Sequence, residues 1–438
     1  MPRSFRLAAV CLAAWALTTA ALPASAADLL AIYQQALAAD PTLSAAQAHL
    51  GAVQEGVAQA QAPLLPQLAA TGSLTHDDAA GQPRGRVQSW GASLNQVLFD
   101  GSQFATLQKA QAEAGAEAAR LQAAQQALCV RVAQAYFGVL GAVDALANAR
   151  ANQQAFELQV SQSEHRVRQG LIAQLDLDQA RAYAGAAVTQ TLAAESALED
   201  AREALRQLTG QPVPALQPLV TPLPLALPEP ADAQAWVQAA LARNPLLAAQ
   251  AGSLEAAEQA ITSARRQHWP TLSAGVDLAR TREPGSDAAT EHTWALTLKV
   301  PLFSGGITQS QVRQAAYQRD EARDGLEALR RQLSRETLAH YRGVVAGAAQ
   351  VRAAELARDA AERALAATRV GQELGTRTMT DLLLAIQTQT STQGSYSQLR
   401  HQFVLEHLLL KQAGGALSEA DLGALNTLLA PLAVASAR

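Results

Sequence analysis

The stretch QSWGASLNQVLFDG, residues 88–101, decides the fold of this chain. Its residues alternate between an apolar set and a small or polar set, which are Trp90, Ala92, Leu94 and Leu98 against Ser89, Gly91, Ser93 and Asn95. A period of two residues predicts a β-strand with one apolar face and one polar face. The pattern stops at residues 99–101, and a long alanine-rich helical pattern follows.

The same succession of patterns occurs again in HTWALTLKVPLFSGG, residues 292–306. Its apolar face carries Trp294, Leu296, Leu298, Val300 and Leu302, and its other face carries Thr293, Thr297 and Lys299. Trp294 follows Trp90 by 204 positions, and Phe303 follows Phe99 by the same number. Later the offset is 205, and Gly170, Asp176 and Gly210 match Gly375, Asp381 and Gly415. We therefore predict an internal duplication in which each copy carries two strands able to cross a membrane.

The first 26 residues are predicted to be a signal peptide. Arg3 and Arg6 precede an apolar run over residues 7–22, and Ala24, Ser25 and Ala26 supply the small-residue cleavage site. A transmembrane anchor is the alternative, but the run is short for one. The mature chain is expected to be exported.

Composition excludes several classes of function for the mature chain. Removal of Arg3 and Arg6 leaves 32 basic and 38 acidic residues and no basic tract, so a nucleic-acid partner is not expected. Cys129 is then the only cysteine, so no intrachain disulfide can form. No nucleophile is paired with a base, and the histidines lack metal-ligand spacing, so we expect neither an enzyme nor a cofactor.

Each copy is predicted to run helix, strand, loop, strand, long helix, break and long helix. The predicted divisions are a signal peptide (1–26), a first repeat (27–210), a proline-rich linker on the surface (211–230), a second repeat (231–415) and a C-terminal equatorial segment (416–438). The first helix of each copy is expected to break at Asp40-Pro41 and at Asn244-Pro245, because Asp or Asn before Pro is a typical helix start. No later segment is apolar over about 18 residues, so a membrane crossing would have to use strands.

Four strands cannot close a barrel, and open sheet edges are not tolerated in lipid. Bacterial barrels begin at about 8 strands, so two chains would supply 8 and three would supply 12. The inward residues favour the wider, water-filled barrel because they are small or polar: Ser89, Gly91, Ser93, Asn95, Ser273, Gly275, Thr293 and Thr297. The opposite face is predicted to meet lipid through Trp90, Leu94, Trp294, Leu296 and Leu298. An interfacial belt is expected at one strand end from His76, Trp90, His292 and Trp294.

These segments resemble the TolC family of outer-membrane exit ducts. The resemblance is carried by IYQQALAADPTL, QAPLLPQLAA, AYFGVLGAVDAL, RVRQGLIAQLDLDQARA, LRQLTG, PLFSGGITQSQVRQA and LGTRTMTDLLLA, which cover nearly the whole mature chain in order. It implies a mixed fold, a membrane β-barrel joined to a long α-helical coiled-coil barrel, built by a homotrimer in the outer membrane of a Gram-negative bacterium and extending into the periplasm. It also implies a periplasmic adaptor, an inner-membrane pump of the ABC or RND type, and export of secreted protein, small molecules or both. The alternative from patterning alone is a soluble periplasmic coiled-coil scaffold.

The resemblance also implies roles for residues at the two breaks between long helices. The tips that adaptors grasp would be formed by Arg166, Arg168, Gly170, Leu171, Gly375 and Thr376. The alternative for the two glycines is a plain turn, since glycine suits the left-handed position after a helix.

Asp176 and Asp381 each stand six residues after those glycines. In a trimer each would form a ring of negative charge at the periplasmic entrance, and such rings favour cations; the alternative is a carboxylate that interacts with a helix N-terminus. Leu384 stands where the family has a second aspartate, so cation block is expected to be weak or absent. By resemblance, Arg377 and Asp176 are expected to latch the closed tip, with Gln372 at the position of a family tyrosine and Leu175 at that of a threonine.

Overall fold

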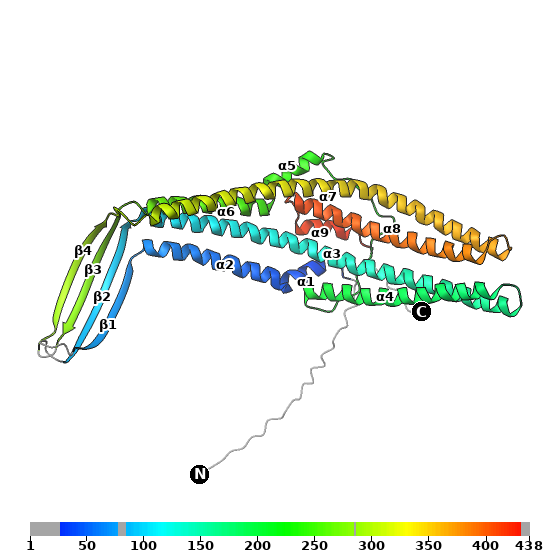
Figure 1. Ribbon diagram of the computed structural model, residues 1–438, viewed down its shortest axis with the longest axis horizontal. Helices are drawn as coiled ribbons and strands as arrows, with labels where there is room; N and C mark the ends of the chain where they lie inside the picture. Colours follow the sequence, from blue (N-terminus) through cyan, green and yellow to red (C-terminus); the bar gives the residue numbers. More distant parts are fainter. Residues whose placement is uncertain (1–26, 78–84, 284–285, 431–438) are drawn as a thin grey trace, which may run out of the picture.

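The computed structural model describes residues 27–77, 85–283 and 286–430, and the predicted signal peptide lies outside them. The chain is an elongated body with a sheet at one end and two helical hairpin tips at the other (Figure 1). Its central core contains residues of both copies, including Leu29, Leu128, Tyr136, Val344 and Leu410.

The two predicted helix breaks are confirmed. α1 (Leu29–Ala39) is followed by α2 (Pro41–Gln61), and α5 (Ala233–Arg243) by α6 (Pro245–Arg266). Asp40 accepts a hydrogen bond from the Thr42 N–H, and Asn244 accepts one from the Leu246 N–H. The following proline needs no hydrogen-bond acceptor because it has no N–H, so each pair ends one helix and starts the next.

The four strands form one antiparallel sheet in chain order. They are β1 (Gln67–Asp77), β2 (Gly85–Phe99), β3 (Thr271–Arg282) and β4 (Ala289–Lys299). A short 3₁₀ turn, η1 (Ala62–Leu64), leads into β1. β4 ends at Lys299, so Val300 and Leu302 lie beyond the strand to which their pattern assigned them, and Pro301 cannot donate a ladder hydrogen bond there. Within the described residues, β1 and β4 are the edges of the sheet.

Four long helices form two hairpins. The first is α3 (Gly101–Arg168) with α4 (Gln174–Thr209), and the second is α7 (Ile307–Glu373) with α8 (Met379–Ala413). The 68 residues of α3 make a helix about 100 Å long at 1.5 Å per residue. Asp100 starts α3 by accepting from the N–H groups of Ser102 and Gln103, and α7 starts after Gly306, whose φ is 84°.

A window of α3 is apolar enough, by composition, to cross a membrane, contrary to the expectation that no such segment follows the signal peptide. More than half of this window is buried, and α3 packs against α1, α4 and α8. We therefore assign it to the core between the hairpins.

The proline-rich linker lies mostly on the surface, as its composition predicted, but three of its leucines turn inward. Leu216, Leu219 and Leu223 are buried in the central core. The hydroxyl of Tyr136 donates to the Gln217 carbonyl at 2.9 Å, and Arg400 Nη2 donates to the Val220 carbonyl at 2.6 Å. The last helix, α9 (Glu419–Asn426), starts at a capping box between Ser418 and Asp421 and packs nearby. The linker is thus anchored by its leucines and by its backbone.

Candidate functional site

The register of the sheet places the predicted apolar residues on one face across all four strands. One row on this face consists of Leu68, Leu94, Val276 and Trp294. Trp294 is 80% exposed and Leu296 is 70% exposed, and Trp90 and Leu298 are exposed as well. Nothing within the described chain covers this face, which is unusual for so many large apolar side chains.

The opposite face of the sheet is small and polar, as the alternation predicted. One row consists of Ala69, Ser93, Asp277 and Thr293, and the row two residues nearer the loops consists of Thr71, Gly91, Ala279 and Glu291. Ser73 and Ser89 join their hydroxyls across β1 and β2 at 2.7 Å. A Cβ at Gly91 would come within 2.8 Å of the Thr71 hydroxyl oxygen, so a larger residue there would displace the Thr71 side chain.

The expected belt of aromatic and histidine residues at one strand end is wrong. His76 pairs with Arg86, Trp90 with Gly72 and Arg280, and His292 with Leu278. Trp294 lies in the middle of β4, five residues from either end. The four residues therefore occupy four different rows, because the period of two fixes the face of a strand but not the register of its partner.

The two hairpin tips have the same backbone construction. Gly170 and Gly375 adopt the left-handed backbone conformation, with φ of 70° and 76°. In both turns the residue after the glycine donates its N–H five residues back, from Leu171 to the Arg166 carbonyl and from Thr376 to the Gly371 carbonyl. This is the Schellman ending, which requires a left-handed residue and so explains the glycines.

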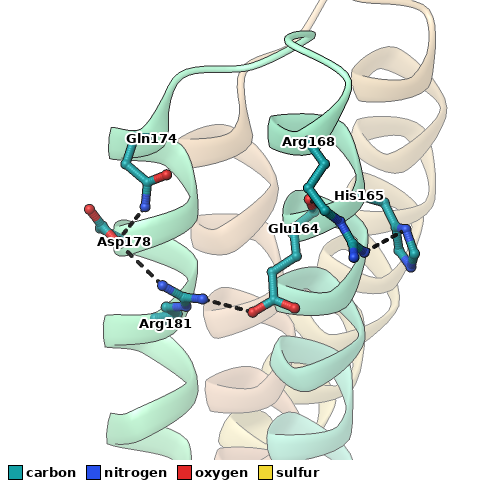
Figure 2. Close-up of polar contacts among 6 residues, drawn as sticks. All are labelled: Glu164, His165, Arg168, Gln174, Asp178 and Arg181. Atoms are coloured by element: carbon teal, nitrogen blue, oxygen red, sulfur yellow. Dashed lines mark hydrogen bonds and ion pairs between the residues drawn. The ribbon is translucent and has the colours of Figure 1, made fainter.

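Polar and charged side chains of α3 and α4 interact just below the turn of the first tip (Figure 2). Arg181 joins Glu164 of α3 at 2.8 Å and approaches Asp178 at 3.9 Å, and Gln174 donates to Asp178 at 3.1 Å. Arg168 contacts the His165 ring at 2.9 Å. These contacts tie α3 to α4 below the turn and leave Leu171 68% exposed at its apex.

The second tip also has an exposed apolar residue, but it stands before the glycine and not after it: Leu374 is 73% exposed. The Arg377 N–H donates to the Gly371 carbonyl at 3.1 Å. A Cβ at Gly371 would lie 2.7 Å from the Arg377 Cγ, so the arginine packs closely on the last turn of α7. Gln372 is half-buried in that turn, and its backbone carbonyl accepts the Gly375 N–H at 3.2 Å.

Asp176 and Asp381 occupy equivalent positions but have different environments. Thr378 donates to the Asp381 carboxylate from its backbone N–H at 3.0 Å and from its hydroxyl at 2.8 Å, which completes a capping box. These hydrogen bonds, with the nearby charge of Arg377, hold the pKa of Asp381 below its usual value. The equivalent of Thr378 in the first copy is Ala173, which has no hydroxyl, so Asp176 has no such cap.

The expected latch residues do not meet within one chain. Among the ion pairs of the described residues none joins Arg377 to Asp176, and the acidic group that Arg377 influences is Asp381. One polar contact that does connect the two hairpins near their tips is a hydrogen bond from the Thr380 hydroxyl of α8 to Gln179 Oε1 of α4, at 3.2 Å. The patterns that predicted the tips gave no sign of this contact.

Sequence reasoning also missed a polar seam between α3 and α8. The Asn148 side chain donates to the Thr390 carbonyl at 2.8 Å, and the Thr390 hydroxyl donates to Asn152 Oδ1 at 3.1 Å. Gln159 and Ser163 continue the seam with buried, unpaired side-chain atoms. A cavity of about 1280 Å³ opens along α3 and α8. The four residues on α3 recur at steps of four, seven and four, which is the signal that identifies the seam.

Known proteins share both the sequence and the fold of this chain. The profile of the outer membrane efflux protein family matches residues 32–211 and again 236–416. The outer membrane protein TolC of Escherichia coli strain K12 is 31% identical over 422 residues, covering 92% of this chain and 85% of that protein. The chain therefore belongs to the outer membrane efflux protein family, and the match in two parts agrees with the duplication.

Other relatives and solved structures agree with this assignment. The alkaline protease secretion protein AprF of Pseudomonas aeruginosa is 29% identical over 336 residues, covering 75% of this chain and 70% of that protein. The structure of CusC superposes with a TM-score of 0.77 at 19% identity, covering 89% of this chain and 92% of that one. The open-state MtrE channel of Neisseria gonorrhoeae superposes with a TM-score of 0.74 at 20% identity, covering 89% of this chain and 90% of that one. These structures share the fold; the family identifies the chain as an outer-membrane exit duct that extends into the periplasm.

Proposed function

We propose that three copies of this chain form a continuous duct through the outer membrane and the periplasm. The observation that carries the proposal is the four-stranded sheet, which has an uncovered apolar face, a small polar face and two open edges. Open edges must be paired in lipid, and three copies would supply 12 strands. A barrel of that size encloses a wide lumen, which fits the small inward residues.

The duct would receive cargo from an inner-membrane pump through a periplasmic adaptor. Type I secretion of protein is the first candidate, since the relatives include the alkaline protease secretion protein AprF and the proteases secretion protein PrtF of Dickeya chrysanthemi, which is 27% identical. Small-molecule efflux is the second candidate, because the family takes its name from efflux. An ABC-type pump would accompany the first cargo and an RND-type pump could accompany the second.

The adaptor would dock on the six hairpin tips of the trimer. The exposed Leu171 and Leu374 offer one apolar contact on each tip, Leu171 directly after the turn glycine and Leu374 directly before it. Arg166, Arg168, Gly170, Gly375 and Thr376 surround these leucines in the sequence. Because both tips have the same turn, one kind of adaptor surface would fit both.

The entrance of the duct would be controlled at the same end. Three copies of Asp381 and of Asp176 would ring the opening, and Leu384 would weaken any cation block. Arg377 would restrain the closed tip through Asp176 of a neighbouring chain, since the two do not pair within one chain. Gln372 would contribute a hydrogen bond where the family has a tyrosine. The chain would act as a passive conduit with no catalysis of its own.

Recordings in planar lipid bilayers test the duct directly. We expect the purified protein to require detergent, to behave as a trimer and to give discrete ion-conducting steps. A monomer that stays soluble without detergent and gives no conductance would instead identify a periplasmic scaffold. Cargo is tested separately, by supplying the duct to cells that lack their own and measuring secreted protease and drug resistance.

A further inference from the structure

A cluster of basic and aromatic residues lies where the second copy passes from helix to sheet. Residues 265–270, the last two residues of α6 and the four that lead to β3, have the sequence RRQHWP, and the equivalent residues 61–66 of the first copy have QAPLLP. Both segments lead into the first strand of their copy and end in a proline. The turn itself therefore does not need the charges of Arg265, Arg266 and His268, because the first copy makes it without them.

The geometry at this junction places the aromatic rings on the apolar face of the sheet. The register of β2 against β3 shifts between Val97 and Phe99, so that Phe99 pairs with Leu272 on the apolar face, in the row that also contains Leu298. A bulge of this kind re-aims a side chain. Trp269 stacks on Phe99, with ring centroids 6.4 Å apart and planes 9° apart. Trp269 is therefore on the face that would meet lipid.

The cationic side chains lie beside the Trp269 ring, on the helical side of the junction. The Arg266 guanidinium lies 5.3 Å from the centre of the Trp269 ring and donates to the Gly101 carbonyl at 3.4 Å. Arg265 and His268 are exposed. Within the described residues neither arginine has an acidic partner within ion-pair distance. The order leucine, aromatic ring, cation is that of hydrocarbon, interface and headgroup in a bilayer.

A purely structural role explains only part of the cluster. A Cβ at Gly101 would lie 2.8 Å from the Trp269 ring and 3.3 Å from Arg266, so these two side chains pack on the start of α3. Both arginines also lie in the last turn of α6, where cations interact favourably with the helix C-terminus. Neither effect gives a reason for His268 or for the 47% of Trp269 that remains exposed. An anionic ligand at the edge of the membrane accounts for all of them.

We propose that this junction binds the headgroup of an anionic phospholipid in the periplasmic leaflet of the outer membrane. Arg265 and Arg266 would hold the phosphate, since guanidinium groups donate paired hydrogen bonds to phosphate oxygens. Trp269 would lie between the headgroup and the acyl chains. The inference rests on the proposed duct, which puts this end of the sheet at the periplasmic surface. A trimer would carry three such sites.

The test exchanges the second copy's residues for those of the first. Native mass spectrometry of the detergent-purified assembly would measure the binding of phosphatidylglycerol and of phosphatidylethanolamine to the wild type, to Arg265→Gln and to Arg265→Gln/Arg266→Ala. An arginine near an anionic surface contributes about fivefold in affinity, so we expect phosphatidylglycerol binding to fall on the order of tenfold or more in the double variant. The single variant, which removes an exposed side chain, is expected to lose about fivefold.

The matched control is Arg330→Gln/Arg331→Ala, which removes two adjacent arginines from α7, away from the sheet. Unchanged lipid binding by the Arg265 and Arg266 variants would overturn the site, and so would an equal loss in the control. Displacement of the lipid by inorganic phosphate would assign the cluster to free phosphate instead. Conductance measured on the same samples separates the two proposals: channels without the lipid preference refute this site alone, and absent channels refute the duct.

Discussion

The orientation of the sheet gives a sharp prediction, because two adjacent residues of β4 should respond oppositely to the same substitution. Leu296 is 70% exposed on the apolar face, two residues from Trp294 at the middle of the strand, and Thr297 is on the polar face. Arginine on the lipid face near the bilayer midplane costs about 2–4 kcal/mol. We expect Leu296→Arg to cost about 2 kcal/mol per chain, hence about 6 kcal/mol for a barrel of three chains.

Thr297→Arg places the same side chain in the wet lumen, where no such cost applies. The assay is the urea dependence of unfolding in lipid vesicles, together with the yield of assembled protein in outer membranes. Leu296→Arg should lower both, whereas Thr297→Arg should leave both near the wild type and change the conductance. The orientation of the faces is refuted if Thr297→Arg destabilises the assembly and Leu296→Arg does not.

Three further predictions concern the helical part. Tyr136→Phe removes a buried hydroxyl that bonds the Gln217 backbone in the linker, so we expect unfolding to become easier by about 1–3 kcal/mol in urea titrations; an unchanged midpoint would show that this hydroxyl does not help to hold the linker. His401 is buried against Phe137, with Asp144 at 3.9 Å and Arg400 beside it, and burial foremost lowers its pKa. Because the folded state then binds this proton less readily than the unfolded state, stability should fall as the pH drops below about 6.5, and His401→Gln should flatten that dependence in urea titrations at several pH values. Arg377→Ala should raise single-channel conductance by loosening the closed tip, and unchanged conductance would refute the latch.

The sequence by itself determined the elements and their repetition. The period of two around Trp90 and Trp294, the breaks at Asp40 and Asn244, and the glycines that end the long helices are local patterns, and the structure has all of them. Each follows from the conformations that a few neighbouring residues can adopt, so no distant contact was needed to predict it. The duplication supplied an internal check, because each element was predicted twice.

Only the tertiary structure decided how these elements meet. The register across the sheet separated His76, Trp90, His292 and Trp294 into different rows, and the bulge in β2 turned Phe99 toward the apolar face. Core packing, which composition does not encode, buried the linker leucines. Asp176 and Asp381 stand at equivalent positions of the two copies. Asp381 forms a capping box with Thr378, whereas the N-cap residue before Asp176 is Ala173, which has no polar side chain to form one. Register, packing and pairing across the chain depend on residues that are distant in the sequence, and local periodicity carries no information about them.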